Sequence, residues 1–190
     1  MDIPVSVLLD ANVLYPAPLR DLLIRLAQNG LIRPKWSNAI HDEWMRNLVN
    51  NNPSLNPDRL IRTKNLMNDA VRDCLVQGFE PLINSLTLPD PDDRHVLAAA
   101  IHARVQFIVT FNLKDFPAQT LATFHMEAIH PDELLIQLFD SAPGFVCSAI
   151  KRQRESLRNP PRSAAELVQT LNSQGLPQFV DRIKAVLESL

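Results

Sequence analysis

A run of five mostly apolar residues, Val5–Leu9, ends directly on Asp10, and this feature constrains the fold more than any other. An apolar run without polar alternation is typical of a strand that is buried on both faces of a parallel sheet. Residues 107–111, 126–130 and 78–83 are further strand candidates. Because helical patterns separate these runs, we expect an α/β fold in which helices cover both sides of a central parallel sheet, in three layers.

Several of the predicted helices carry start or stop signals. Ser37 is the expected N-cap of one helix, Gly30 ends another, and Pro57 and Pro131 stand in first turns. Two prolines and three aspartates mark residues 88–95 as a loop. We expect helices, in chain order, at residues 19–30, 38–52, 57–76, 93–105 and 131–140.

The alternation of strands and helices stops near residue 140, and the remaining chain reads as helical throughout. Three helices are predicted there, at residues 145–157, 163–174 and 176–190. We therefore predict an α/β domain over residues 1–135 and a C-terminal helical extension over residues 136–190.

Composition limits the compartment and the partners. The two cysteines give no disulfide framework, which favours a reducing, cytoplasmic location. No run of 18 apolar residues indicates a membrane span, and the first residues lack the basic start of a signal peptide. The net charge is −2, so any affinity for nucleic acid must come from a local patch.

Acidic and amide side chains follow the predicted strands where the strands end. In an open parallel sheet, ligands bind beyond the carboxyl ends of the strands. The candidate residues are Asp10 after the first strand, Asn112 and Asp115 after residues 107–111, Asp90, Asp92 and Asp93 in the loop, and Glu43 on a helix. These groups can meet at one edge of the sheet.

Carboxylates that gather in one place repel one another unless a cation neutralises them. An oxygen-only donor set suits Mg²⁺, or Mn²⁺ as a substitute, better than Zn²⁺. Such an ion polarises a phosphoryl oxygen and lowers the pKa of water. The residues alone therefore indicate metal-assisted hydrolysis of a phosphodiester.

The segments "LLDANVL", "NAIHDEW" and "DPDDRHVLAAAIHARVQFIVTFNLKDFP" follow one another in an order that resembles the PIN-domain ribonucleases. The likeness covers about residues 5–130 and is strongest to VapC-like toxins of bacterial toxin–antitoxin pairs. It implies a three-layer α/β/α domain and a Mg²⁺-dependent endoribonuclease whose substrate is RNA. It also implies a small antitoxin protein as partner, which can insert a basic side chain among the acids, and it is compatible with a homodimer.

The same resemblance assigns site residues. Asp10 matches the metal ligand after the first strand, and Asn12 matches the polar neighbour that orients it. Glu43 matches the helical glutamate, and Asp93 the third acid, with Asp92 and Asp90 as competing assignments. At the fourth acidic position the chain has Asn112, with Asp115 three residues later, which leaves one or two metal ions open.

Supporting roles come from the residues themselves. Thr110, at a strand end, can hydrogen-bond an acid or a water, or simply belong to the core. Residues 151–162 hold five Lys or Arg, of which Lys151, Arg152, Arg154 and Arg158 are candidates for binding RNA phosphates or acidic residues of a partner. A second basic group consists of Arg46, Arg59, Arg62 and Lys64. His95 is expected to face solvent or pack in its helix.

Two rival functions remain at this stage. A phosphatase of the haloacid dehalogenase type also has an aspartate after its first strand, but Asn12 stands where its second acid is expected. A non-catalytic RNA-binding PIN domain would have an incomplete set of acids. Assays with a generic phosphoester and with RNA in the presence of a chelator distinguish these alternatives.

Overall fold

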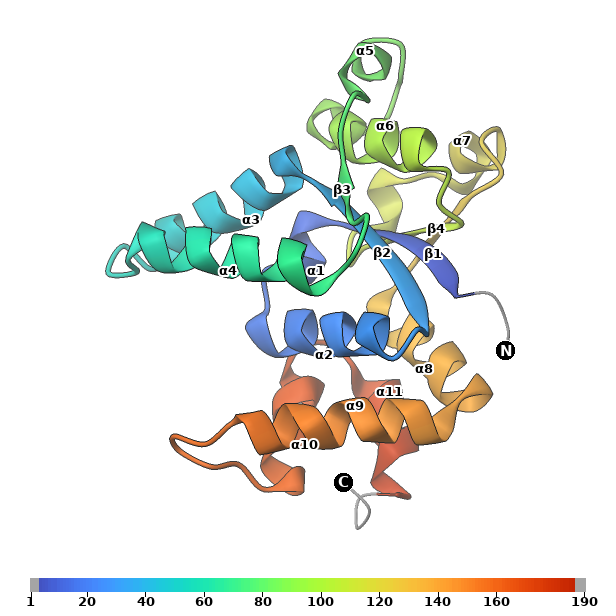
Figure 1. Cartoon of the computed structure of the whole chain (residues 1–190). Helices are drawn as coiled ribbons and strands as arrows, with labels where there is room; N and C mark the ends of the chain where they lie inside the picture. Colours follow the sequence, from blue (N-terminus) through green and yellow to red (C-terminus); the bar gives the residue numbers. More distant parts are fainter. Residues whose placement is uncertain (1–3, 187–190) are drawn as a thin grey trace.

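The computed structural model describes residues 4–186 and contains a five-stranded sheet with helices on both of its faces (Figure 1). The strands are β1 (Val5–Leu9), β2 (Ile32–Ser37), β3 (Leu75–Val76), β4 (Phe107–Val109) and β5 (Glu127–Ile129). The α/β helices are α1 (Ala11–Leu14), α2 (Ala17–Gln28), α3 (Asn38–Asn51), α4 (Pro57–Ala70), α5 (Glu80–Ile83), α6 (Arg94–Ala103) and α7 (Ala118–Ala122). The later helices are α8 (Pro131–Ser141), α9 (Pro143–Ser156), α10 (Ala164–Ser173) and α11 (Pro177–Lys184).

All four strand pairings in the sheet are parallel, and the strand order is β3-β2-β1-β4-β5. The chain therefore winds in one direction from β1 to β2 and β3, and in the other direction from β4 to β5. The point where the direction reverses lies between β1 and β4. In such sheets the crevice beyond the carboxyl ends of these two strands is the usual place for a ligand.

The sheet lies between two helical layers, as predicted for a three-layer α/β/α fold. Helix α6 packs against β1, β2, β3 and β4, whereas α2 lies on the other side of the sheet (Figure 1). Ala98, Ala99 and Ala100 of α6 have no exposed surface, because their small side chains let the helix approach the strands closely. Val7, Leu8 and Leu9 are equally inaccessible, as expected for a strand covered on both faces.

The local signals explain where several elements begin. The Ser37 hydroxyl accepts a hydrogen bond from the backbone N–H of Ile40, which confirms its predicted role as the N-cap of α3. Pro57 and Pro131 stand in the first turns of α4 and α8, where a missing N–H costs nothing. The strands predicted from residues 107–111 and 126–130 are present as β4 and β5.

Two predictions around residue 76 were wrong. Residues 78–83 were predicted as a strand but contain α5, in which Pro81 occupies the first turn. A proline there suits a helix and would remove a ladder hydrogen bond from a strand. The helix predicted to reach residue 76 ends at Ala70, and Leu75–Val76 instead form β3 beside Trp36 and Ser37.

The helices after β5 form a further layer that packs on the α/β part of the chain. Helix α9 contacts α2 and α8, and α11 contacts α8 and α10 (Figure 1). The buried carboxylate of Asp132 accepts hydrogen bonds from the backbone N–H groups of Gln178 (3.1 Å) and Phe179 (2.8 Å) at the start of α11. This contact fixes α11 against α8. The predicted domain division at residue 135 falls within α8 and stays a prediction.

Among residues 4–186, no single helix is both long and apolar enough to cross a membrane. Helices α8 and α9, which meet at a bend of 120°, reach that length and apolar character only as a pair.

A buried polar network lies beneath α3. The Nδ1 atom of His41 accepts a hydrogen bond from Trp44 Nε1 (3.0 Å), so its Nε2–H faces Asn68 Oδ1 at 3.2 Å. Asn68 Oδ1 also accepts from Trp36 Nε1 (2.8 Å). His41 is fully buried, and burial lowers its pKa from 6.5 to about 4. The native state therefore holds this imidazole neutral.

We predict that His41 makes the fold sensitive to acid. Because the folded pKa is depressed, its contribution is present above pH 6.5 and is lost as the pH falls toward 4. The variant His41→Asn removes this titration. The free energy of unfolding of wild type minus that of the variant should therefore decrease by about 2 kcal/mol as the pH falls over that range. Urea unfolding at several pH values measures it. His102→Asn, on the exposed side of α6, should follow the wild-type pH dependence; an unchanged difference for His41→Asn would contradict the prediction.

Candidate active site

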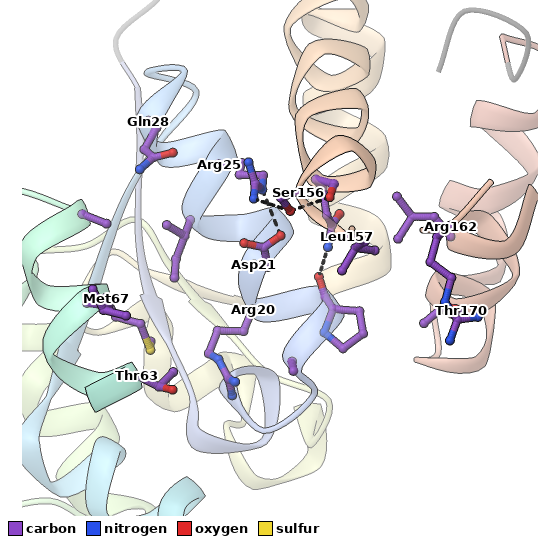
Figure 2. A pocket seen from close by; sticks show the side chains of 17 residues that line it. Arg20, Asp21, Arg25, Gln28, Thr63, Met67, Ser156, Leu157, Arg162 and Thr170 are labelled. Atoms are coloured by element: carbon purple, nitrogen blue, oxygen red, sulfur yellow. Dashed lines mark hydrogen bonds and ion pairs between the residues drawn. The ribbon is translucent and has the colours of Figure 1, made fainter. Parts of the chain in front are cut away.

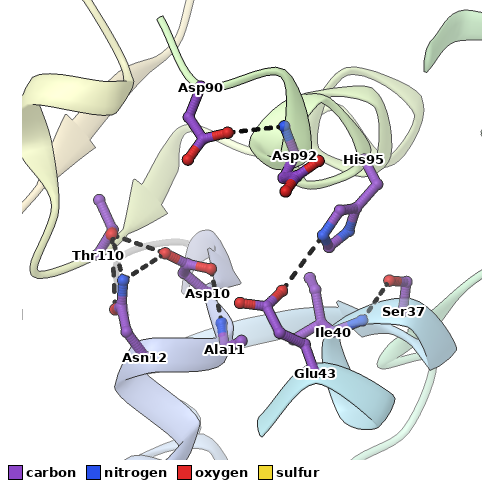
Figure 3. A network of polar contacts seen from close by, with 10 residues as sticks. All are labelled: Asp10, Ala11, Asn12, Ser37, Ile40, Glu43, Asp90, Asp92, His95 and Thr110. Carbon is purple, nitrogen blue, oxygen red and sulfur yellow. Dashed lines mark hydrogen bonds and ion pairs between the residues drawn. The ribbon is translucent and has the colours of Figure 1, made fainter. Parts of the chain in front are cut away.

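Asp10 is held at the carboxyl end of β1 by three short hydrogen bonds (Figure 3). Its Oδ1 accepts from the backbone N–H of Ala11 at 2.6 Å, and its Oδ2 accepts from Thr110 Oγ1 and from Asn12 Nδ2, both at 2.7 Å. The backbone N–H of Asp10 donates to the carbonyl of Val109 in β4 (3.1 Å). Residues at the ends of β1 and β4, between which the winding direction of the chain reverses, therefore hold this carboxylate from both sides.

Asn12 connects Asp10 to the segment after β4. Its Oδ1 accepts a hydrogen bond from the backbone N–H of Phe111 at 3.1 Å, while its Nδ2 lies 3.0 Å from Thr110 Oγ1. Thr110 has no exposed surface, and its hydroxyl also accepts from the backbone N–H of Asn112 (3.0 Å). Asn12 and Thr110 thus hold the Asp10 carboxylate in its orientation.

The second part of the site comes from α3 and α6. Glu43 Oε2 lies 3.3 Å from His95 Nε2, and both side chains are mostly buried (Figure 3). His95 Nδ1 is buried and has no hydrogen-bond partner among the described residues. His95 was expected to face solvent or pack in its helix, but its side chain is mostly buried and lies beside Glu43 of α3.

An acidic pocket of about 680 Å³ lies over these groups. Arg46 and Asn47 of α3 lie on one side of the pocket. Its other lining side chains that could offer oxygen atoms to a metal ion are Asp42, Glu43, Asp90, Asp92, Asp93, Asn112 and Asp115. Asp90 Oδ1 accepts from the backbone N–H of Asp92 (2.9 Å), so Asp90 also caps the turn that precedes α6. The loop before α6 and the turn after β4 therefore face the same space as Glu43.

The carboxylates disfavour one another's ionised forms. Burial raises the pKa of Asp93 from 3.8 to about 7, with further increases from Asp10, Asp90, Asp115 and Glu43. Burial also raises the pKa of Asp10 to about 6, against the hydrogen bond from Thr110, and Glu43 raises it further. The site therefore brings several carboxylates close together, which disfavours the ionised forms of Asp10 and Asp93.

The donors fit a hard divalent cation in their chemistry, since carboxylate and amide oxygens predominate and negative charge accumulates. In the placement of residues 4–186, however, no group of three or more His, Cys, Asp or Glu side chains could hold a metal ion as it stands.

The structure separates the predicted site residues into two sets. Those near the switch point are Asp10, Asn12, Thr110, Glu43, Asp93, Asn112 and Asp115, either in the network around Asp10 or lining the acidic pocket. Lys151, Arg152 and Arg154 lie on α9, where Arg152 donates to the Asn29 side chain at the end of α2. These three basic residues do not line the acidic pocket that the described chain forms. Their role in binding RNA stays a prediction.

A separate groove of about 710 Å³ lies between α2, α4 and the C-terminal helices (Figure 2). Arg25 crosses from α2 toward α9, donating to Asp21 Oδ2 (2.9 Å) and Ser156 Oγ (3.0 Å). Arg162 is the member of the basic run that lines this groove, together with the exposed Leu66 and Leu157. The groove therefore combines apolar side chains with positive charge. Its lining residues are different from those of the acidic pocket.

Comparisons with known proteins agree with this arrangement. A family model described as "PIN domain" matches residues 6–114, and one described as "VapC50 C-terminal domain" matches residues 131–185. "Putative ribonuclease VapC50" of Mycobacterium tuberculosis (strain ATCC 25618 / H37Rv) is 35% identical over 97 residues, which are 51% of this chain. The chain spans 57% of the length of that relative. No solved structure is significantly similar to the chain.

We predict that Asp93→Asn stabilises the metal-free protein. Because the folded pKa of Asp93 is raised, its contribution is lost as the pH rises from about 4 through about 7. The neutral amide removes the repulsion, and since the Asp93 side chain is only partly buried and solvent screens its charge, we expect a gain of about 1 kcal/mol at pH 7.5. Thermal unfolding in EDTA measures the gain. Asp69→Asn, an exposed change on α4, is the control, and equal stability of the two variants would refute the prediction.

Proposed function

Because the chain belongs to the PIN-domain family, we propose that it is a metal-dependent endoribonuclease that acts as the toxin of a toxin–antitoxin pair. The observation that carries the proposal is the acidic pocket at the β1–β4 switch point, where burial and neighbouring carboxylates raise the pKa of Asp93 to about 7. Similarity to a protein named as a ribonuclease supports RNA as the substrate. Arg46 at the pocket rim offers a contact for a phosphate.

In this proposal Asp10, Glu43 and Asp93, with Asp115 or Asn112, would hold Mg²⁺, or Mn²⁺ as a substitute. A divalent ion bound there supplies positive charge for the phosphate oxygens and makes water more acidic. Asp10 presents a fixed oxygen pair, because Ala11, Asn12 and Thr110 hold it. His95 restrains the Glu43 carboxylate. These contacts orient ligands before substrate arrives, which is the contribution that a protein makes to such chemistry.

Two other functions would use parts of the same surface. A haloacid dehalogenase-type phosphatase would use Asp10, but the amide of Asn12 is committed to Asp10 and Phe111 and offers no second acid. In a non-catalytic RNA-binding domain, the carboxylates of the acidic pocket would have no function. The family match favours the nuclease over the phosphatase. A cytoplasmic location and a homodimer stay predictions.

We predict that Asp10→Asn and Asp93→Asn each lower the rate of RNA cleavage by about 100-fold or more. Both changes preserve side-chain shape while removing a charge from the pocket. Cleavage of a labelled single-stranded RNA is followed on gels, with Mg²⁺, with Mn²⁺ and with EDTA, and EDTA should abolish it. Asp69→Asn should cleave like wild type.

The same assay tests the alternatives. Cleavage that persists in EDTA or in Asp93→Asn would refute the proposed use of the acids. Hydrolysis of p-nitrophenyl phosphate without RNA cleavage would favour the phosphatase. RNA binding without cleavage under any metal condition would favour the non-catalytic domain.

We also predict that expression of the chain arrests bacterial growth, because cleavage of cellular RNA stops protein synthesis. Asp93→Asn should relieve the arrest at equal protein level, measured by culture density and immunoblot. Co-expression of the small protein encoded beside the gene should restore growth and co-purify with the chain. Arrest that is equally strong in Asp93→Asn would show that growth inhibition does not depend on cleavage.

A further inference from the structure

A further cavity, of about 730 Å³, is distinct from the groove between α2 and α4. It lies beside the acidic pocket, differs from that pocket in the chemistry of its walls, and is called the second cavity below. Its lining includes the rings of Tyr15 and Phe111, the aliphatic side chains of Leu48 and Leu55, and the guanidinium-bearing Arg20. Acidic side chains are missing from its lining in the described chain, in contrast to the neighbouring pocket. The cavity therefore suits a flat, partly apolar group that belongs to a negatively charged molecule.

The second cavity is linked to the acidic pocket through Asn12, which belongs to the network around Asp10 (Figure 3). Asn12 lines the second cavity and donates to Asp10 Oδ2 at 2.7 Å. The chain passes from one cavity to the other between consecutive residues, since Phe111 lines the second cavity and Asn112 lines the acidic pocket. A nucleotide chain with a phosphate over the acids can thus place an adjacent base in the second cavity.

The C-terminal helices build one wall of this cavity. Ser173, Gln174 and Gly175 line it from the turn between α10 and α11. Gly175 has a φ of +80°, and a Cβ at this position would lie 3.2 Å from Phe111 Cε1, so glycine permits both the turn and the close approach. Phe111 is also held edge-on by His130, at 5.0 Å between ring centroids.

One polar atom in this wall has no partner. Gln174 Oε1 is buried and makes no hydrogen bond with the described residues. Buried acceptors are normally paired, and since Gln174 lines the cavity, a turn of its side chain would bring this oxygen to a donor that enters the cavity. Every nucleobase carries an N–H group, either as an exocyclic amine or in the ring, and a planar face that stacks on aromatic side chains.

We propose that this cavity is a nucleobase-binding subsite, in which a base of the RNA lies against Tyr15 and Phe111 and donates an N–H to Gln174. Arg20 supplies a positive charge at the wall; burial lowers its pKa only to about 10, so it stays charged at neutral pH. The C-terminal helices thereby take part in selecting the RNA. The inference rests on the proposed ribonuclease function.

The experiment compares the full chain with Gln174→Met and Tyr15→Leu, using a single-stranded RNA that wild type cleaves. Each nucleotide near the cleaved bond is replaced in turn by an abasic one. In wild type, removal of one base should lower kcat/KM about tenfold, the usual effect of losing one stacked base. In each variant the intact RNA should show a similar loss, and the same abasic replacement should then cost nothing further. Gln169→Met, an exposed change on α10, is the matched control and should respond like wild type.

The outcomes separate the subsite from the activity. If Gln174→Met, Tyr15→Leu and wild type respond equally to every abasic replacement, the subsite is refuted while the ribonuclease proposal stands. If no RNA is cleaved, fluorescence anisotropy of a labelled ten-nucleotide RNA in EDTA applies the same abasic series. In that measurement, a base-specific loss of affinity in wild type that is absent in both variants supports the subsite, and its absence from wild type refutes it.

Discussion

The repulsion among carboxylates beyond the sheet is the constraint on which the rest of the structure depends. Asp10 is almost completely buried, and Asp93, Glu43 and Asp115 approach the same region from other elements. Burying ionised groups near one another costs free energy unless hydrogen bonds or a cation offset it. The rest of the fold therefore has to contribute enough favourable free energy to offset this cost.

The source of that stability is the covered parallel sheet. The central strand β1 is inaccessible to solvent over Val7–Leu9, and the alanines of α6 let that helix approach four strands at once. At the end of β1, the Asp10 carboxylate accepts hydrogen bonds from Ala11, Asn12 and Thr110. Asp10 therefore stands on well-packed elements, whereas Asp90, Asp92, Asn112 and Asp115 reach the site from the loop before α6 and the turn after β4.

The sequence predicted the parts of this arrangement that local chemistry determines. The apolar run before Asp10, the Ser37 N-cap and the alanines of α6 identify their elements directly. The strand β2 was not predicted, because Arg33, Pro34 and Lys35 give it no apolar pattern, and its neighbours in the sheet define it instead. Likewise, the distance between the basic residues of α9 and the acidic pocket depends on how helices pack, which local patterns do not encode. The contact of His95 with Glu43 joins two helices that are far apart in the sequence, so no local pattern predicts it, and the assignment of metal ligands still rests on the family resemblance.

The Asp132 carboxylate holds α11 in one position against α8, because it accepts hydrogen bonds from two consecutive backbone N–H groups at the start of α11. A helix anchored through its first turn cannot slide along its neighbour by a residue without losing both bonds. Phe179, Val180 and Ile183, at and beyond that anchor, are buried, so α11 adds apolar packing to the two hydrogen bonds. The turn at Gly175 lies three residues before Gln178, and insertions between α10 and α11 should be counter-selected.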